Sequence, residues 1–235
     1  MRSRSGRTAP SEPSRLGLRR LSRLENLRLA LMRRVFGLLY HQMAWSYDAV
    51  AWLVSGGYWR DWGRTVLVDL PGRRVLDLGH GTGQLLVDLW TAGYHAFGCD
   101  LSHAMGRLAR RRLEGHDLPA RLVCGRAQQL PFSAGCFDAV VCTFPAEFGG
   151  KPETLAELER VLAPGGRAVV VLAAVPAGAD RTGWLLTRLF RLAGHSAADG
   201  LSVPTQFEVA GLRGAAGWVP TPGGQVLVVR LCKPG

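Results

Sequence analysis

Val75-Leu76-Asp77-Leu78-Gly79-His80-Gly81-Thr82-Gly83 predicts more about this protein than any other segment. The apolar residues on both sides of Asp77 are typical of a buried parallel strand. Glycine at every second position from 79 to 83 lets the backbone turn tightly and approach a ligand closely. Residues 84–90 then have the spacing of a helix that packs back on a sheet. Together these features predict a pocket whose backbone N–H groups point at a bound anion.

A second strand is predicted at residues 95–99, and it ends in Asp100, 17 residues after Gly83. An acid at this place in a βαβ unit can accept hydrogen bonds from both ribose hydroxyls of a nucleoside cofactor. The spacing therefore favours a nucleoside site over a tight turn that binds nothing.

Strands and helices alternate along the rest of the chain. We expect strands at 73–78, 94–99, 120–124, 137–142 and 167–174, and helices at 83–92, 102–114, 153–162 and 182–192. Residues 217–220 and 225–231 flank a Pro-Gly-Gly turn and predict a terminal hairpin. The pattern predicts an α/β fold: a doubly wound, mostly parallel, seven-stranded sheet with a C-terminal antiparallel hairpin.

The N-terminal arm, residues 1–42, is separate in character from the domain predicted at 43–235. Its first 14 residues are rich in Ser, Arg and Pro and are expected to be disordered. Residues 15–42 have leucines at helical spacing and arginines on the other faces, which predicts a basic amphipathic helix. Three interpretations stay open: a helix that covers the domain, peripheral contact with an anionic membrane surface, or a targeting segment.

The charge of the chain is concentrated in this arm. Residues 1–40 hold ten Arg and two Glu, so only +3 of the net charge of +11 belongs to the other 195 residues. A nucleic-acid partner is therefore not expected for the folded domain. The five cysteines form no CxxC pair and have no His partners at zinc spacing, so no metal site is predicted. Cysteines within apolar runs favour a reducing, cytoplasmic compartment.

Four segments follow one another in a recognisable order: the Asp77–Gly83 loop, residues 98–105 (GCDLSHAM), Leu130-Pro131-Phe132 with the run 137–141, and residues 159–166 (ERVLAPGG). Together they resemble the class I S-adenosylmethionine-dependent methyltransferases, near the branch of ubiquinone- and menaquinone-biosynthesis-type enzymes. The resemblance covers about residues 73–174. Tyr47-Asp48 also looks like the Tyr-Asp segment that precedes the domain in many members.

The resemblance implies a Rossmann-like methyltransferase fold, S-adenosyl-L-methionine as the cofactor, and a set of site residues. The glycine loop would cradle the methionyl part, Asp77 would orient its amino group, and Asp100 would hold the ribose. Tyr47 is the favoured candidate for a catalytic base, ahead of His41, His80 and Glu147. The cofactor-binding candidates are Asp77, Gly79, His80, Gly81, Thr82, Gly83, Asp100, Leu101, Met105, Arg126, Ala127, Gln128, Thr143 and Phe144.

Two departures from the family pattern affect these expectations. Arg126 stands where members often have an acid that faces the adenine, so the backbone of residues 126–128 and the Gln128 side chain would have to make that contact. The segment Thr143-Phe144-Pro145-Ala146 is not the Asn/Asp-Pro-Pro-aromatic motif of the enzymes that methylate nucleic-acid amino groups. This second departure argues against DNA or RNA bases as substrates.

The predicted function is transfer of a methyl group to a small hydrophobic acceptor by in-line displacement. Trp45, Tyr47, Trp52, Phe148 and Trp184 would form an apolar roof over the acceptor. Two alternatives stay open: an RNA methyltransferase that uses the basic arm as a phosphate clamp, and a non-catalytic, methyltransferase-like binding module. A nicotinamide dehydrogenase would need glycine at position 84, where this chain has Gln84. No oligomeric state is predicted.

Overall fold

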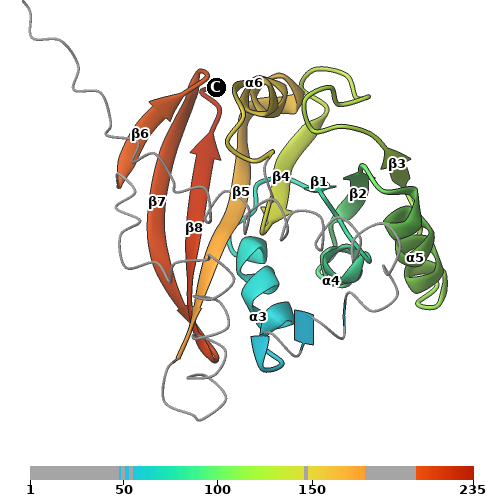
Figure 1. The fold of residues 1–235 in the computed structure, drawn as a ribbon. Coiled ribbons are helices and arrows are strands. Elements are labelled where there is room, and N and C mark those ends of the chain that lie inside the picture. Colours follow the sequence, from blue (N-terminus) through green and yellow to red (C-terminus); the bar gives the residue numbers. More distant parts are fainter. Residues whose placement is uncertain (1–47, 49–50, 53–54, 146–147, 178–204) are drawn as a thin grey trace, which may run out of the picture.

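The computed structural model describes residues 48, 51–52, 55–145, 148–177 and 205–235. It confirms the predicted alternation of strands and helices (Figure 1). In chain order the elements are α3 (Trp59–Arg64), the 3₁₀ helix η2 (Thr65–Leu67), β1 (Arg74–Leu78), α4 (Gln84–Thr91), β2 (His95–Asp100), α5 (His103–Glu114), β3 (Leu122–Cys124), β4 (Phe137–Thr143), α6 (Pro152–Val161), β5 (Leu162–Pro176), β6 (Gln206–Val209), β7 (Leu212–Thr221) and β8 (Gly224–Cys232).

The strands form one sheet in the order β3-β2-β1-β4-β5-β8-β7-β6. Strands β1 to β5 pair in parallel, and β5, β8, β7 and β6 pair in antiparallel fashion. The described part of the chain therefore has eight strands, where the sequence predicted seven. The added strand, β6, forms the outer edge next to β7, and its four residues were too few to be recognised from the sequence.

Two apolar cores lie on opposite faces of the sheet. Along β1, Val75 packs in the core under α3 and α4, whereas Leu76 and Leu78 pack in the core under α6. This alternation is the period-two pattern of a strand that is covered on both faces. Parallel strands with helices on both faces are what the sequence predicted.

The C-terminal half of the sheet is antiparallel and contains the hairpin of β7 and β8. Strand β5 pairs with β8 from Arg167 opposite Cys232 to Pro176 opposite Gly224. Residues Pro222 and Gly223 form the turn between β7 and β8, and Gly223 has φ +75°. Proline followed by a residue with positive φ is the sequence signature of a type II turn. The predicted terminal hairpin is thus confirmed.

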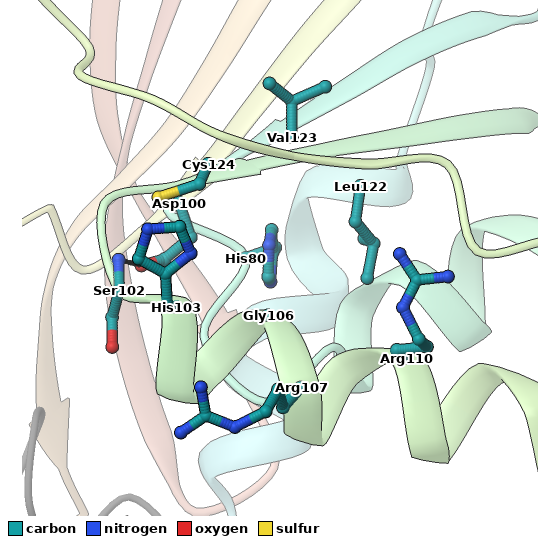
Figure 2. A pocket seen from close by; sticks show the side chains of 10 residues that line it. All are labelled: His80, Asp100, Ser102, His103, Gly106, Arg107, Arg110, Leu122, Val123 and Cys124. Atoms are coloured by element: carbon teal, nitrogen blue, oxygen red, sulfur yellow. Dashed lines mark hydrogen bonds between the residues drawn. The ribbon is translucent and has the colours of Figure 1, made fainter.

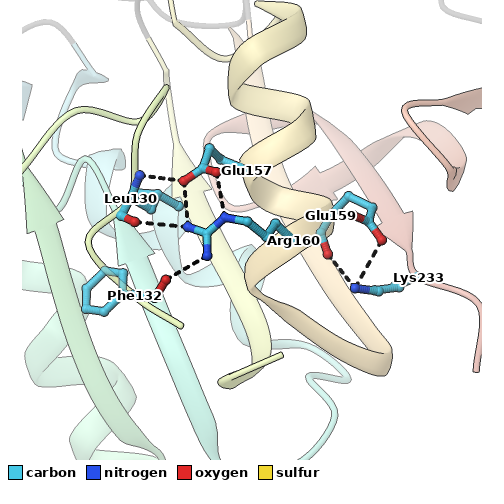
Figure 3. A network of polar contacts seen from close by, with 6 residues as sticks. All are labelled: Leu130, Phe132, Glu157, Glu159, Arg160 and Lys233. Carbon is cyan, nitrogen blue, oxygen red and sulfur yellow. Dashed lines mark hydrogen bonds and ion pairs between the residues drawn. The ribbon is translucent and has the colours of Figure 1, made fainter. Parts of the chain in front are cut away.

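A polar network links two of the segments that carried the family resemblance (Figure 3). The Arg160 guanidinium donates to the carbonyls of Leu130 (2.9 Å) and Phe132 (2.7 Å) and pairs with Glu157 (2.6 Å). The Glu157 carboxylate in turn accepts a hydrogen bond from the Leu130 amide. These segments therefore fasten the loop before β4 to α6, and their role in the fold is structural.

Several predictions fall on residues that the structure does not describe. They concern the arm at 1–42 with His41, the residues Trp45, Tyr47, Glu147 and Trp184, and the helix at 182–192, and they stay predictions. Within the described residues no helix has the length and apolar character needed to cross a membrane.

Candidate active site at the carboxyl ends of β1, β2 and β4

The glycine loop connects β1 to α4 at the carboxyl edge of the parallel strands. Asp77, the second-last residue of β1, lies between Gly98 of β2 and Val141 of β4 in the register of the sheet. Open α/β sheets bind ligands at this edge, where neighbouring strands carry helices on opposite faces. The topology therefore brings Asp77, the loop and the end of β2 to one place.

The three loop glycines need their conformational freedom for different reasons. All of them have positive φ, from +52° at Gly81 to +81° at Gly83. A Cβ on Gly83 would lie 2.8 Å from the Ala109 Cβ, so this glycine allows α4 and α5 to pack closely. A Cβ on Gly81 would meet no atom of the described residues within 4 Å. Gly81 therefore faces open space, as expected for backbone that approaches a ligand.

Asp100 lies against the glycine loop. It is buried at the end of β2, and its carboxylate accepts hydrogen bonds from the Gly81 amide (2.9 Å) and the Ser102 amide (2.8 Å). Ser102 is also the N-cap of α5, where its hydroxyl accepts a hydrogen bond from the Met105 amide. The predicted partnership between the loop and the acid after β2 is therefore a direct contact in the structure.

Asp77 is a buried acid with an unsatisfied oxygen. Its side chain is 2% exposed, and its Oδ2 has no hydrogen-bond partner among the described residues. Burial, and secondarily the nearby Asp100 carboxylate, raise the pKa of Asp77 to about 8. A cation bound beside Asp77 would favour its ionised form and offset the cost of burying that charge. The two acids are thus well suited to bind a cation.

His80 points inward and is buried beneath the loop. Its Nδ1 lies 2.8 Å from the Gly81 carbonyl oxygen, and burial lowers the pKa of the ring. Because a carbonyl only accepts, the neutral ring carries its proton on Nδ1 and leaves Nε2 as an acceptor. A Cβ on Gly98 would lie 2.7 Å from His80 Cδ2. Glycine at position 98 therefore makes room for this histidine.

A pocket of about 200 Å³ lies beside Asp100 and His80, between α5 and β3. Figure 2 shows the residues that line it. Its other walls come from Ser102, His103, Gly106, Arg107, Arg110, Leu122, Val123 and Cys124. Sites for drug-sized ligands have roughly 300–1,000 Å³. The pocket is therefore large enough for only part of a nucleoside cofactor. The sequence predicted Asp100 and His80 as site residues but none of the α5 and β3 residues that line the pocket.

Five of the predicted cofactor contacts, Leu101, Met105, Arg126, Ala127 and Gln128, differ in exposure, and none of them lines this pocket. Leu101 is 56% exposed, and Met105 is a fully buried residue of α5. Arg126 is exposed, Ala127 is buried and Gln128 is half-buried. Leu101, Arg126 and Gln128 thus have surface available to a ligand, whereas Met105 supports α5 from within the core.

The end of β4 carries an aromatic pair. Phe144 has φ +51°, which is a rare backbone conformation for a bulky residue, and its amide donates to the Val171 carbonyl at 2.7 Å. Its ring stacks on Trp59 of α3 with centroids 4.3 Å apart. Thr143, next to it, is half-buried. The sequence predicted Thr143 and Phe144 here but did not single out Trp59.

Two further residues contact the loop: Arg112, which the sequence did not point to, and Asp48, which was noted only as part of Tyr47-Asp48 and without a role. The Arg112 guanidinium donates to the Thr82 carbonyl, and the Thr82 hydroxyl donates to the Asp48 carboxylate at 2.7 Å. Arg112 and Asp48 also form an ion pair. The two residues are 64 positions apart, so no local pattern could have linked them.

Comparison with known proteins agrees with this geometry. The profile of the family described as "Methyltransferase domain" matches residues 75–166. The demethylmenaquinone methyltransferase of Thermus thermophilus is 37% identical over 139 residues, which are 57% of this chain and 63% of that protein. The enzyme of the same name from Beutenbergia cavernae is 39% identical over 147 residues, 59% of this chain and 58% of that one. The chain thus spans less than two thirds of these relatives.

Solved structures share the fold. A SAM-dependent methyltransferase from Thermotoga maritima has a TM-score of 0.55 at 18% identity, and the match covers 83% of this chain and 98% of that one. A geranyl diphosphate methyltransferase solved with GPP and sinefungin has a TM-score of 0.51 at 16% identity, over 74% and 77% of the two chains. Residues 75–166 therefore match the profile of a methyltransferase domain, and the chain shares the fold of these S-adenosylmethionine-dependent methyltransferases.

Proposed function

We propose that this chain transfers a methyl group from S-adenosylmethionine to a small, hydrophobic acceptor of the quinone type. One observation carries the proposal: a glycine loop with an open face at Gly81 lies between two buried acids, Asp77 and Asp100. The match of residues 75–166 to the profile of the methyltransferase domain family supports the choice of cofactor. The activity after which the two relatives are named supports the choice of acceptor.

The residues at the loop fit the charge of this cofactor. S-adenosylmethionine carries a positive sulfonium and, near neutral pH, a protonated amino group. The unsatisfied Asp77 Oδ2 is a buried acceptor that such a cation would complete. Asp100 would accept from the ribose hydroxyls, and the open face of Gly81 leaves space for the close approach of the methionyl part.

Methyl transfer from this cofactor depends more on the positioning of the acceptor than on acid–base groups. The cofactor, when bound, supplies a methyl group that its positive sulfur has already activated. The chain would align the acceptor opposite that sulfur and exclude water, and alignment alone can lower a barrier by roughly 7–11 kcal/mol in favourable cases. Tyr47 stays the proposed base for an acceptor that must lose a proton.

The aromatic pair at the end of β4 favours a flat apolar acceptor. Phe144 and Trp59 are half-buried and stack on each other next to the loop strand β1. Phe148 lies near the loop as well, since a Cβ on Gly79 would be 3.3 Å from its ring. Aromatic faces bind planar rings by offset stacking and by burial of apolar area. Trp52, also predicted in this roof, is 64% exposed.

Calorimetric titration tests the cofactor assignment. We expect S-adenosylmethionine and S-adenosylhomocysteine to bind and NADH not to bind. The Asp100→Ala variant should lose most of the affinity while its far-UV circular dichroism stays that of the wild type. Unchanged affinity in this variant would contradict the proposed role of Asp100.

An assay with labelled S-adenosylmethionine tests the reaction. Methyl transfer to a reduced demethylmenaquinone analogue, detected by mass spectrometry of the product, is the expected result. Transfer to RNA instead, lost at raised salt and on deletion of residues 1–40, would favour the RNA methyltransferase alternative. Cofactor binding without any transfer would favour the binding module.

A further inference from the structure

A three-residue network, which we call the Thr82 clasp, holds the outer side of the glycine loop. One nitrogen of the Arg112 guanidinium donates to the Thr82 carbonyl (2.7 Å) and to the Thr82 hydroxyl (2.6 Å). The other terminal nitrogen donates to the Asp48 carboxylate. The Thr82 hydroxyl closes the ring by donating to the second oxygen of Asp48 (2.7 Å). Three residues from separate parts of the chain thus meet at one loop residue.

The position of the Thr82 clasp lets it fix the conformation of the loop, whereas it contributes little to the stability of the core. Thr82 is buried, but the side chains of Arg112 and Asp48 are 26% and 47% exposed. Ion pairs with that much exposure contribute little to global stability because water and salt screen them. The geometric effect is local: the planar guanidinium fixes the direction of the Thr82 carbonyl, and with it the peptide plane between Thr82 and Gly83.

The inner side of the loop is held by other groups. The Asp100 carboxylate accepts from the Gly81 amide, and the His80 ring donates to the Gly81 carbonyl. Consecutive loop residues are therefore fixed from opposite directions, Gly81 from within and Thr82 from outside. Without the outer contact, a loop with glycine at every second position would sample many conformations.

We propose that Asp48 and Arg112 are positioning residues that preorganise the glycine loop for the cofactor. This inference rests on the proposed function, because it assigns the ordered loop to cofactor binding. Ordering a flexible loop at the moment of binding lowers affinity, and a loop that is already ordered avoids this cost. The clasp also joins the chain at Asp48 to the loop, so the segment that precedes the domain takes part in the site.

The test compares two arginines in the same turn of α5. Arg112→Gln removes the clasp, whereas Arg111→Gln removes one charge from an exposed side chain that forms no ion pair within the described residues. We expect Arg112→Gln to weaken S-adenosylmethionine binding about tenfold, the effect of releasing one ordered residue. Its melting temperature should stay that of Arg111→Gln, and kcat at saturating cofactor should change little. Equal affinities in the two variants would overturn the proposal.

A second comparison tests the pair itself. Asp48→Asn should weaken binding to a similar extent, and the double variant Asp48→Asn/Arg112→Gln should be no weaker than either single variant, because all three break one network. Raised salt should reduce the affinity of the wild type more than that of the variants. Additive losses would mean that the two residues act separately and would overturn the clasp.

Amide hydrogen exchange gives a readout that does not need the cofactor. In the ligand-free protein, residues 79–84 should exchange about tenfold faster in Arg112→Gln than in Arg111→Gln, with unchanged protection in β1 and β4. This result would support the clasp even if S-adenosylmethionine did not bind the wild type, in which case the proposed function alone would fail. Equal exchange rates in the loop would overturn the clasp.

Discussion

Replacing Asp77 by asparagine should make the ligand-free protein more stable, and increasingly so as the pH rises. The carboxyl group ionises near 3.8 in the unfolded chain, but burial first and Asp100 second raise its pKa to about 8 in the folded protein. Between these values the folded state binds more protons than the unfolded state, so a rise in pH destabilises the wild type. The asparagine side chain has a similar shape and does not titrate, and the variant therefore escapes this loss.

The size of the effect follows from the two pKa values. Each pKa unit is worth about 1.4 kcal/mol, so the wild type should lose about 4 kcal/mol relative to Asp77→Asn between about pH 5 and about pH 8.5. A loss of this size is large beside the ~5–15 kcal/mol that stabilise a typical domain. Urea unfolding of both proteins without cofactor, repeated across this pH range, measures the difference directly.

Asp138 of β4 offers a matched control in the same sheet. The Arg74 guanidinium, which donates to its carboxylate, holds the pKa of Asp138 at about 2. The stability that this pair contributes is present above pH 3.8 and is lost only as the pH falls toward 2. Asp138→Asn should therefore lower the free energy of unfolding by about 1 kcal/mol. This loss should be the same at every pH between about 5 and about 8.5. If Asp77→Asn also gave a constant difference, the carboxyl group would be ionised throughout, and the argument from burial would be refuted.

Three further substitutions test the site and its support. Gly83→Ala should destabilise the fold by about 2–4 kcal/mol in thermal unfolding, because the new Cβ clashes with α5 and because residue 83 has a positive φ. A loss well under 1 kcal/mol would mean that α4 and α5 separate easily. Gly81→Ala should lower the free energy of unfolding by only about 1–2 kcal/mol, yet it should abolish cofactor binding. Wild-type affinity in this variant would argue against an approach of the cofactor at Gly81. Phe144→Leu should raise KM for the acceptor about 3–10-fold with cofactor affinity unchanged, as it removes the stacking on α3. An unchanged KM would place the acceptor elsewhere.

The parallel half of the fold could be predicted because its signals are local. The run 75–83 carries the strand, the turn and the helix start in consecutive residues, and the structure puts β1 and α4 within one residue of the predicted limits. The contact between Asp100 and Gly81 also follows from local spacing, since a βαβ unit of ordinary length brings these residues together.

The parts that were missed depend on tertiary contacts. Strand β6 has the alternating pattern Gln-Phe-Glu-Val, but four residues at a sheet edge are ambiguous until β7 is present to pair with them. The stacking of Trp59 on Phe144 and the ion pair of Asp48 with Arg112 join positions 85 and 64 residues apart. Sequence periodicity contains no information on which aromatic or charged residues meet over such separations.

The raised pKa of Asp77 is explained by the proposed role of this acid in binding the cofactor. A buried carboxyl group with an unsatisfied oxygen lowers stability, and such groups persist mainly where function requires them. In the ligand-free protein a proton neutralises Asp77, whereas a bound sulfonium and amino group would stabilise the ionised form and displace that proton. Cofactor binding near pH 7 should therefore release close to one proton. Calorimetric titrations in two buffers of different ionisation enthalpy would measure this release, and Asp77→Asn should abolish it. A wild type that binds the cofactor without releasing a proton would show that the cation lies away from Asp77.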